Sequence, residues 1–403
     1  MASVPSSTLI PVHTVQLQLG MHVAELDRSW LQTSFHSHGF VLTHPDQIKE
    51  LQRVCDHVYV DPLLSEQSDD FFSTGLTGRM EVIGLTGPVT PLDRQRVELR
   101  TLAHAYSVAV QGARRSGDVV PGNLRRALSP VVASLETDAD SIPWLLSTEL
   151  KVGYLHRRAL GTAVLMVLAG RQMGFRRPYL DDLALAGLLL DIGKISVPVT
   201  ILAKSQPLSS HERGFIERHV RRGLYMLNGC SDVPEIVEEA ILGHHERLDG
   251  SGYPLGVRGT RIPIAARLAA VADTYDAMLL DRRYAPAIAP HNAIRQVNSL
   301  CGRKFDAAIV KVFMRTLGLF PTASWLQVAD GRVGLVRCQA QGEPARPHVA
   351  LVCDSAGRKL PGGPTLWQPA GRGDVVRVLE PGNMRVPLRQ LEESVAAAAN
   401  LAA

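Results

Sequence analysis

Side chains of the types that bind metal ions are concentrated between residues 191 and 273. They are Asp191 in LLLDIGK, His219 in IERHV, His244 and His245 in GHHERLDGSGYP, and Asp273 in AVADTYDA. Neutral imidazole nitrogens and carboxylate oxygens suit borderline divalent cations such as Mn, Fe, Ni or Zn, and such a site can leave one position open for water or phosphate. The residue types therefore predict a metal centre that is open to water or a phosphate group.

The adjacent pair His244-His245 carries more weight than a single histidine does. Taken alone, His219 is explained as a surface or core histidine on a helix. The pair ends an apolar helix and enters a glycine-rich loop, where two bulky polar rings have little reason to pack together. The pair therefore favours a ligand role over a packing role.

Helices must position these residues. From Pro91 to about Leu317 apolar residues recur with helical spacing, and Gly, Pro, Asp or Ser separates the segments. This pattern predicts an all-α domain that carries the metal-type residues on its helices and loops. The expected helices cover 92–115, 122–135, 143–174, 179–190, 209–228, 233–245, 262–280 and 290–317.

Shorter patterns flank the helical domain. The first part of the chain alternates β-branched runs with turns and one helical stretch, which indicates a small α+β domain. The last part has short β-type runs and a tight turn at Asp330-Gly331, which indicates a β-rich appendage. The predicted fold class is therefore mainly α. The expected boundaries are 1–62 for the α+β domain, 63–91 for a linker, 92–320 for the helical domain, 321–390 for the appendage and 391–403 for a tail.

Composition limits the partners and the compartment. The 403 residues are 45% hydrophobic and 20% charged, which is typical of a globular protein. Lys and Arg number 43 against 39 Asp and Glu, so no basic field favours a nucleic-acid polymer or a membrane surface. The five cysteines are scattered, and the longest apolar stretch, Ala159–Gly170, predicts a buried core helix and not a membrane span. Without a signal peptide at the start, we expect a cytoplasmic protein.

The segment HHERLDGSGYP at 244–254 resembles the signature of the HD-GYP family, bacterial phosphohydrolases that act on cyclic di-GMP. Further agreement comes from DIGKISVP, ILAK, LSSHE, IPIAARLAAVADTYDAM and DRRY, so the resemblance covers roughly residues 150–320. It implies a helical bundle of the HD superfamily. The opening segment, with GMHVAELDRSWL at 20–31, resembles the small domain of unknown function that is often fused ahead of HD-GYP domains.

The resemblance implies one complete metal subsite and one incomplete subsite. The complete subsite is formed by Asp191, His219, His244 and His245. For the other subsite, only Asp273 and the shared Asp191 match the family. Counting back from Gly174 places Arg158 where the family has a His, and Leu190 stands where the HD pair has its His.

Arg158 changes the chemistry of the incomplete subsite. A guanidinium group has five donors, no acceptor and a charge that it cannot shed, so it repels a metal ion. We expect it to pair with Asp191 or Asp273 and to place a protein cation there. His156 does not compensate, because two residues apart on a helix point about 200° away from each other.

The resemblance also implies residues that act on the substrate. Asp191 and Lys194 have catalytic roles, with Lys194 as an electrostatic helper; a solvated loop lysine is the alternative. The family continues with basic residues after the DRRY segment, whereas this chain has Ala285-Pro286-Ala287, which predicts a weaker phosphate grip. The implied substrate-binding residues are Arg158, Gly250, Gly252, Tyr253, Pro254 and Arg282, and turn geometry is the alternative explanation for the glycines alone.

Two functions follow from these residues. The first is a cyclic di-GMP phosphodiesterase that binds one divalent metal, such as Fe or Mn, and forms pGpG and then GMP at a reduced rate. The second is an inactive module that binds cyclic di-GMP or a GGDEF-domain partner and needs no metal. Loss of two ligands from the same subsite favours weak or absent hydrolysis. Whether the chain forms a homodimer is open.

Overall fold

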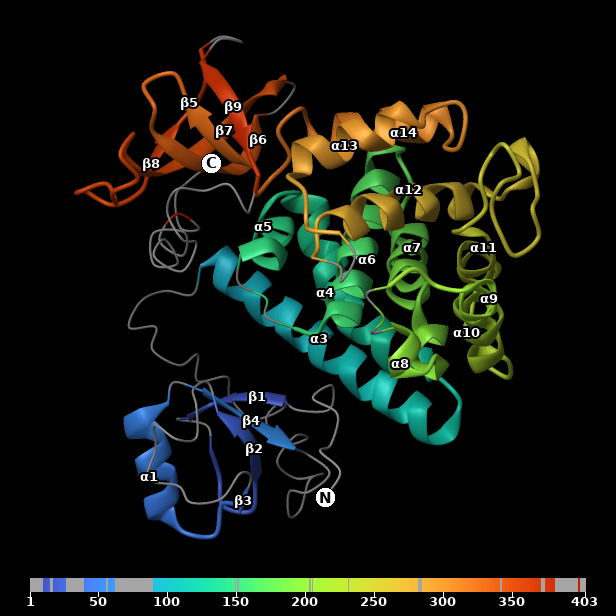
Figure 1. Ribbon diagram of the computed structural model, residues 1–403, viewed down its shortest axis with the longest axis horizontal. Helices are drawn as coiled ribbons and strands as arrows, with labels where there is room; N and C mark the ends of the chain where they lie inside the picture. The colour runs from blue at the N-terminus through green and yellow to red at the C-terminus, as the bar shows by residue number, and fades with distance from the viewer. Residues whose placement is uncertain are drawn as a thin grey trace. The chain divides into compact units, whose positions relative to one another are not determined.

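The structure of the 403-residue chain is a computed structural model that separates into two compact units, Met1–Pro88 and Val89–Ala403. Each unit is described by itself (Figure 1). The described residues are 10–14, 17–26, 40–55, 57–61, 90–148, 150, 152–202, 204, 206–230, 232–281, 285–340, 343–370, 374–380 and 398. Nearly all of the predicted linker, the end of the predicted appendage and most of the predicted tail lie outside them.

The first unit is a small antiparallel sheet with one helix. The strand order is β1-β4-β2-β3, and the helix α1 (Pro45–Val54) precedes the strand β4. Valine and leucine side chains such as Val58 and Leu51 are fully buried between the sheet and α1. The strands are β1 (Ile10–His13), β2 (His22–Leu26), β3 (Phe40–Val41) and β4 (His57–Asp61).

The second unit is mainly helical, which confirms the predicted fold class (Figure 1). Its central helix is α6, in which every residue from Arg157 to Gly170 is buried. This confirms the core helix predicted from Ala159–Gly170, and in the described part of the chain no helix is long and apolar enough to cross a bilayer. The α-helices are α3 (Pro91–Ser116), α4 (Pro121–Thr137), α5 (Ser141–Thr148), α6 (Tyr154–Gln172), α7 (Arg177–Leu189), α8 (Val199–Leu202), α9 (Ser210–Glu217), α10 (His219–Leu227), α11 (Glu235–Gly243), α12 (Ile264–Met278), α13 (Pro290–Ser299) and α14 (Ala307–Leu317).

Capping residues explain where several helices begin. Thr90 accepts a hydrogen bond from the backbone N–H of Asp93 at the start of α3, and Ser209 does the same for Glu212 at the start of α9. The side chain of Asp306 accepts from two backbone N–H groups and begins α14. These contacts satisfy donors that have no partner inside the helix.

Three helices that the sequence predicts as continuous are divided in the structure. The expected helix 143–174 is two helices, α5 and α6, and Gly153, the residue before α6, has a non-helical ψ of 153°. The expected helix 209–228 is interrupted at Arg218, where the side chain of His219 hydrogen-bonds the carbonyl of Ile216. The expected helix 290–317 is divided by a turn in which Gly302 has a φ of 72°.

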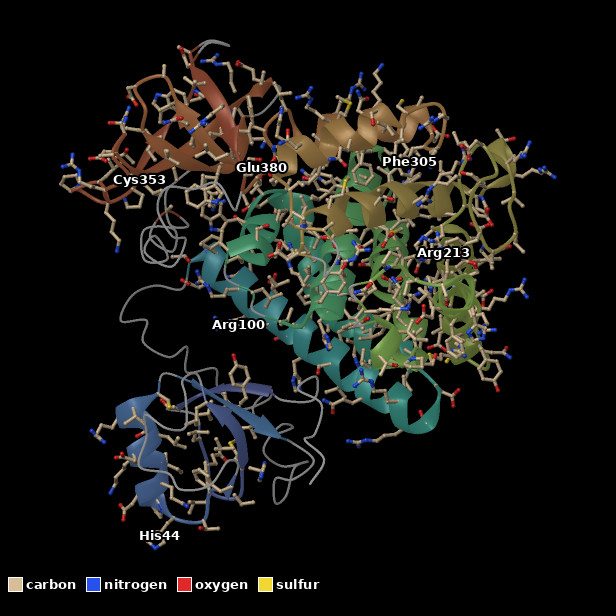
Figure 2. The ribbon with its side chains drawn as sticks, viewed as in Figure 1. His44, Arg100, Arg213, Phe305, Cys353 and Glu380 are labelled. Atoms are coloured by element: carbon tan, nitrogen blue, oxygen red, sulfur yellow. The ribbon has the colours of Figure 1, made fainter. Side chains whose placement is uncertain are left out.

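A five-stranded antiparallel sheet follows the helices, with the order β8-β7-β6-β5-β9. The predicted Asp330-Gly331 turn joins β5 and β6, and Gly331 has a φ of 87°. Trp325 and Leu335 belong to the same buried cluster as the helices. Glu380, labelled in Figure 2, follows the last strand. Its carboxylate accepts a hydrogen bond from the N–H of Ala289 ahead of α13. The strands are β5 (Trp325–Val328), β6 (Val333–Ala340), β7 (Glu343–Cys353), β8 (Thr365–Trp367) and β9 (Val375–Leu379).

Candidate metal centre

Four of the predicted ligands lie together in the second unit. Donor atoms of Asp191, His219, His244 and His245 all lie within 4.8 Å of one another. Asp191 follows α7 and precedes the 3-10 helix Ile192–Ser196, His219 begins α10, and the two adjacent histidines follow α11. Three separate elements therefore deliver one carboxylate and three imidazoles to one place.

Backbone carbonyls orient two of the imidazole rings. The Nδ1 atom of His219 lies 2.7 Å from the carbonyl oxygen of Ile216, and the Nδ1 atom of His244 lies 2.8 Å from that of Ile241. Because a carbonyl can only accept, both Nδ1 atoms donate, and the Nε2 lone pairs are left to face each other across 3.4 Å. This is the tautomer that binds a metal ion through Nε2.

Asp191 divides its two oxygens between different partners. Its Oδ2 atom lies 2.7 Å from Nζ of Lys194, which makes this lysine part of the site. Its Oδ1 atom lies 3.3 Å from Nε2 of His219 and makes no hydrogen bond, and Nε2 of His245 is also buried without a hydrogen-bond partner. Buried lone pairs without partners are costly, and a divalent cation would satisfy them together. The residues present therefore fit a single metal ion.

The protonation states suit metal binding. Burial opposes ionisation of Asp191, but the charge of Lys194 and the neighbouring imidazoles of His219 and His244 together outweigh it and hold the pKa of Asp191 well below its usual range. Burial lowers the pKa of His219 and brings the pKa of His245 well below its ordinary value. A charged carboxylate and neutral imidazoles are the forms that bind metal ions.

The loop that carries Gly252 and Tyr253 folds back onto the histidine pair. The ring of Tyr253 stacks on His245 with a centroid distance of 4.5 Å and an interplanar angle of 29°, and its backbone N–H donates to the carbonyl of His245 at 3.3 Å. A Cβ atom on Gly252 would lie 2.5 Å from Cα of Glu246. Gly252 is therefore required by a close approach of two backbone segments, and Tyr253 supports a predicted ligand.

The other predicted substrate-binding residues of this region lie around that loop. Gly250 has a φ of 75°, which favours glycine, and Pro254 is half-buried. Arg282 lies outside the described residues. Glu246 was not predicted from the sequence, although its place beside the histidine pair was an available signal. Its buried carboxylate accepts hydrogen bonds from the N–H groups of Leu255 at 2.7 Å and Gly256 at 3.1 Å.

Arg158 is buried in α6 and faces the same group of charges. It pairs with the carboxylate of Asp273, donates to the carbonyl of Asp273 at 2.8 Å, and lies 3.1 Å from Oδ2 of Asp276 and 4.0 Å from Oδ2 of Asp191. Burial opposes the charge of Arg158, and these carboxylates more than offset it and raise its pKa. The expected pairing with Asp273 is thus present, with a closer contact to Asp276 than to Asp191.

The remaining predicted positions lie beside this arrangement. Asp273 is not in the group of four close donors, so its role as a metal ligand stays a prediction. Leu190 is buried at the end of α7. The ring of His156 packs edge-on against Tyr106, with centroids 5.2 Å apart, while Arg158 on the same helix reaches the acidic residues.

Two further charged residues, Asp276 and Arg157, belong to the group of buried charges around Arg158 and were not predicted from the sequence. Asp276 lies one helical turn after Asp273, which was the available signal, and it is 1% exposed. Arg157 donates to the carbonyl of Leu146 at 3.0 Å and lies 3.4 Å from Oδ1 of Asp276. Burial raises the pKa of Asp276, and the charges of Arg157 and Arg158 work against this rise.

A helical bundle that brings three imidazoles and one carboxylate together offers the donor set of a metal site, and comparison with known proteins places the bundle in the HD class. Residues 143–309 match the HD domain, and residues 9–75 match a domain of unknown function, DUF3391. A cyclic di-GMP phosphodiesterase of Pseudomonas aeruginosa is 31% identical over 366 residues, which cover 87% of this chain and 86% of that protein. The chain therefore belongs to the HD-GYP family, as the resemblance implied.

Two other similarities are shorter or more distant. A cyclic di-GMP phosphodiesterase of Thermotoga maritima is 36% identical over 152 residues, which cover 37% of this chain and 41% of that protein. The solved structure of Bd1817, a HDG"Y"P protein from Bdellovibrio bacteriovorus, matches with a TM-score of 0.53 and 14% identity over 77% of this chain and 99% of that chain. At this identity the second similarity supports the fold alone.

Proposed function

We propose that this chain hydrolyses cyclic di-GMP at a centre that holds one divalent metal ion. The observation that carries the proposal is the group of four donors in which Oδ1 of Asp191 and Nε2 of His245 are buried without hydrogen-bond partners. The relatives named cyclic di-GMP phosphodiesterases support the substrate. The products are pGpG and then GMP.

The residues of the site divide the work between them. Asp191, His219, His244 and His245 would hold the metal ion, which when bound supplies acidity to a water molecule and polarises a phosphoryl oxygen. Lys194 holds Asp191 in its charged form from 2.7 Å away. Tyr253 keeps the ring of His245 in place by stacking on it.

The charges in contact with one another suit an anionic substrate. The carboxylates of Asp191, Asp273 and Asp276 face three cations, namely Lys194, Arg157 and Arg158. This set is neutral by itself, so a divalent ion would leave it with two positive charges. Cyclic di-GMP has two phosphodiester groups with one negative charge each, which matches that excess.

We further propose that the metal ion is Mn or Fe and that one ion binds. Arg158 supports the number, because its guanidinium takes a carboxylate oxygen of Asp273 and lies 4.0 Å from Asp191. A second cation beside a fixed guanidinium group would meet strong repulsion in this buried place.

The same arginine favours a second candidate function. A buried guanidinium that binds Asp273 and Asp276 can contact a phosphate group without any metal chemistry. The chain would then bind cyclic di-GMP without turnover and act as a sensor, alone or with a GGDEF-domain protein.

One experiment separates these functions. The full chain, loaded anaerobically with Mn or Fe, is incubated with cyclic di-GMP; products are followed by chromatography, and binding of the same ligand is measured in parallel. Turnover that is lost in His244→Ala and kept in His44→Ala supports the phosphodiesterase, since the His44 side chain is 75% exposed in the other unit. Binding without turnover supports the sensor, and absence of both contradicts both functions.

A further inference from the structure

The carboxylate of Asp276 enters the proposed function only through its charge, although it contacts Arg158 directly. Its Oδ2 atom lies 3.1 Å from Nη1 of Arg158, and its Oδ1 atom lies 3.4 Å from Nη1 of Arg157. Both guanidinium groups are buried, and the Asp276 side chain is 1% exposed. One buried carboxylate therefore stands between two arginines that are adjacent in the sequence.

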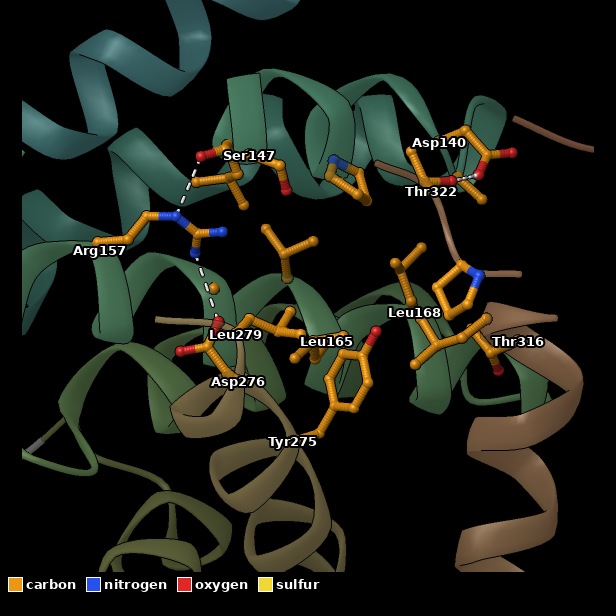
Figure 3. A pocket seen from close by; sticks show the side chains of 17 residues that line it. Asp140, Ser147, Arg157, Leu165, Leu168, Tyr275, Asp276, Leu279, Thr316 and Thr322 are labelled. Atoms are coloured by element: carbon orange, nitrogen blue, oxygen red, sulfur yellow. Dashed lines mark hydrogen bonds and ion pairs between the residues drawn. The ribbon is translucent and has the colours of Figure 1, made fainter. Parts of the chain in front are cut away.

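The contact between Arg157 and Asp276 lies beside a cavity of about 50 Å³ (Figure 3). Arg157, Gly161 and Asp276 line the cavity, whereas Arg158 does not. In Figure 3 the guanidinium of Arg157 points toward Asp276, and its other contact is the carbonyl of Leu146 at 3.0 Å. The guanidinium of Arg157 is thus held by two contacts, and it lies against Oδ1 of Asp276, the oxygen that does not contact Arg158.

Gly161 supplies the room for this contact. A Cβ atom at position 161 would overlap Oδ1 of Asp276 and would lie 2.5 Å from Nη1 of Arg157. Position 161 is in the middle of α6, where a glycine costs stability relative to alanine. The glycine is explained by the space that Arg157 and Asp276 need.

We propose that Asp276 is a positioning residue, which together with Arg157 holds the guanidinium of Arg158 beside Asp191 as the protein's own phosphate-binding cation. This inference rests on the proposed binding of cyclic di-GMP. Asp273 binds Arg158 through both its side chain and its carbonyl, so Asp276 supplies a contact from a second direction. Two anchors restrict an arginine that would otherwise have several rotamers.

The substitution Asp276→Asn separates an effect of charge from an effect of positioning, because the two predict opposite changes in the affinity for an anionic ligand. The substitution removes a negative charge from the site, so Coulomb attraction alone would make an anionic ligand bind more tightly. If Asp276 positions Arg158, the same substitution loosens the guanidinium, because an amide oxygen accepts a weaker hydrogen bond than a carboxylate does, and binding of the ligand weakens. The sign of the change in affinity therefore distinguishes the two.

The test is a double-mutant cycle on the Mn-loaded full chain, with the Kd for cyclic di-GMP as the readout. We expect Arg158→Met to raise Kd by about tenfold, because it removes the cation proposed to contact the phosphate group. We expect Asp276→Asn to raise Kd by a similar factor of about ten, because it weakens the charged hydrogen bond that holds Arg158 in place. We expect the double variant to bind no more weakly than Arg158→Met does. The matched control is Asp182→Asn, which removes a carboxylate that pairs with Arg125 at 2.8 Å. Unchanged or tighter binding by Asp276→Asn, or additive losses in the double variant, would overturn the proposal.

A second readout does not need the ligand. The side-chain NH signals of Arg158, identified in NMR spectra by their loss in Arg158→Met, should exchange slowly with solvent in the natural chain and rapidly in Asp276→Asn. If Asp276→Asn does not fold, Gly161→Ala disturbs the same contact by steric overlap, with Gly112→Ala as the matched control because a Cβ atom there meets nothing within 4 Å. If the NH groups of Arg158 still exchange slowly when its contact with Asp276 is broken, Asp276 does not position Arg158. If the unsubstituted chain binds no cyclic di-GMP, the proposed function is contradicted, and the exchange measurement alone decides on the role of Asp276.

Discussion

At the scale of single residues, Arg158 places a fixed protein cation beside the candidate metal centre. It is buried, it cannot lose its proton, and it occupies the carboxylate oxygen of Asp273 that a metal ion would need. On the other side of Asp191, three imidazoles face one free oxygen atom. One side of Asp191 is thus suited to a metal ion, and the other side faces Lys194 at 2.7 Å and the guanidinium of Arg158 at 4.0 Å.

This arrangement predicts that Arg158→His combined with Leu190→His restores a second metal ion. The double change removes the fixed cation and adds two imidazole nitrogens near Asp191 and Asp273. Elemental analysis after Mn loading should show a rise from about one to about two ions per chain, and phosphodiesterase activity should increase. Arg158→Met with Leu190 unchanged is the control, since it removes the cation without adding a ligand. A count that stays at one in the double variant contradicts the prediction.

The grouping of the four close donors could be predicted from the sequence because they lie in long and specific motifs and are the residue types that metal ions prefer. The Arg157–Asp276 contact could not, because it joins two helices more than a hundred residues apart. Spacing places Asp273 and Asp276 on one face of α12, but the partner that meets this face is set by how α6 packs. The same holds for Tyr253, whose stacking on His245 depends on the path of the loop.

At the scale of elements, the site depends on how closely α6 and α7 approach each other. Arg158 lies on α6, and Asp191 follows the end of α7. A Cβ atom on Gly187 of α7 would lie 2.6 Å from Cα of Ala163 on α6, so the two helices touch backbone to backbone at this point. The distance between the arginine and the carboxylate is therefore set by a glycine that has no chemical role.

We predict that Gly187→Ala lowers the free energy of unfolding by about 1–3 kcal/mol, because the added methyl group forces the two helices apart. Chemical denaturation followed by circular dichroism measures this change. Gly112→Ala in α3 is the control and should be neutral or stabilising by up to about 1 kcal/mol, since it adds helix propensity in open space. Equal effects of the two substitutions would show that the contact between α6 and α7 is not tight.

The helix boundaries show why local patterns leave errors at this scale. The continuous helices expected at 143–174 and 209–228 have the right periodicity, yet they are divided before Gly153 and at Arg218. At the second break, Nδ1 of His219 contacts the carbonyl of Ile216, and its Nε2 atom faces His244. The break between α9 and α10 thus lies directly before His219, a predicted metal ligand.

At the scale of the whole molecule, the two units have separate buried clusters. Leu51 and Val58 belong to the cluster of the first unit, whereas the helices and the C-terminal strands share a cluster in the second. All four close donors lie in the second unit. A ligand that binds only to the folded form of one unit stabilises that unit by mass action.

We therefore predict that Mn²⁺ raises the melting temperature of one unit alone. At a free metal concentration of 100 times Kd the second unit should gain about 2.7 kcal/mol, and EDTA should reverse the gain. Scanning calorimetry of the full chain measures both transitions, and Leu51→Ala identifies the first one, because emptying this fully buried position costs about 2–5 kcal/mol. In His244→Ala the response to Mn²⁺ should disappear while the Leu51-dependent transition stays in place. A shift of both transitions by Mn²⁺ would instead mean that the two units melt together, and the metal ion would then stabilise the whole chain.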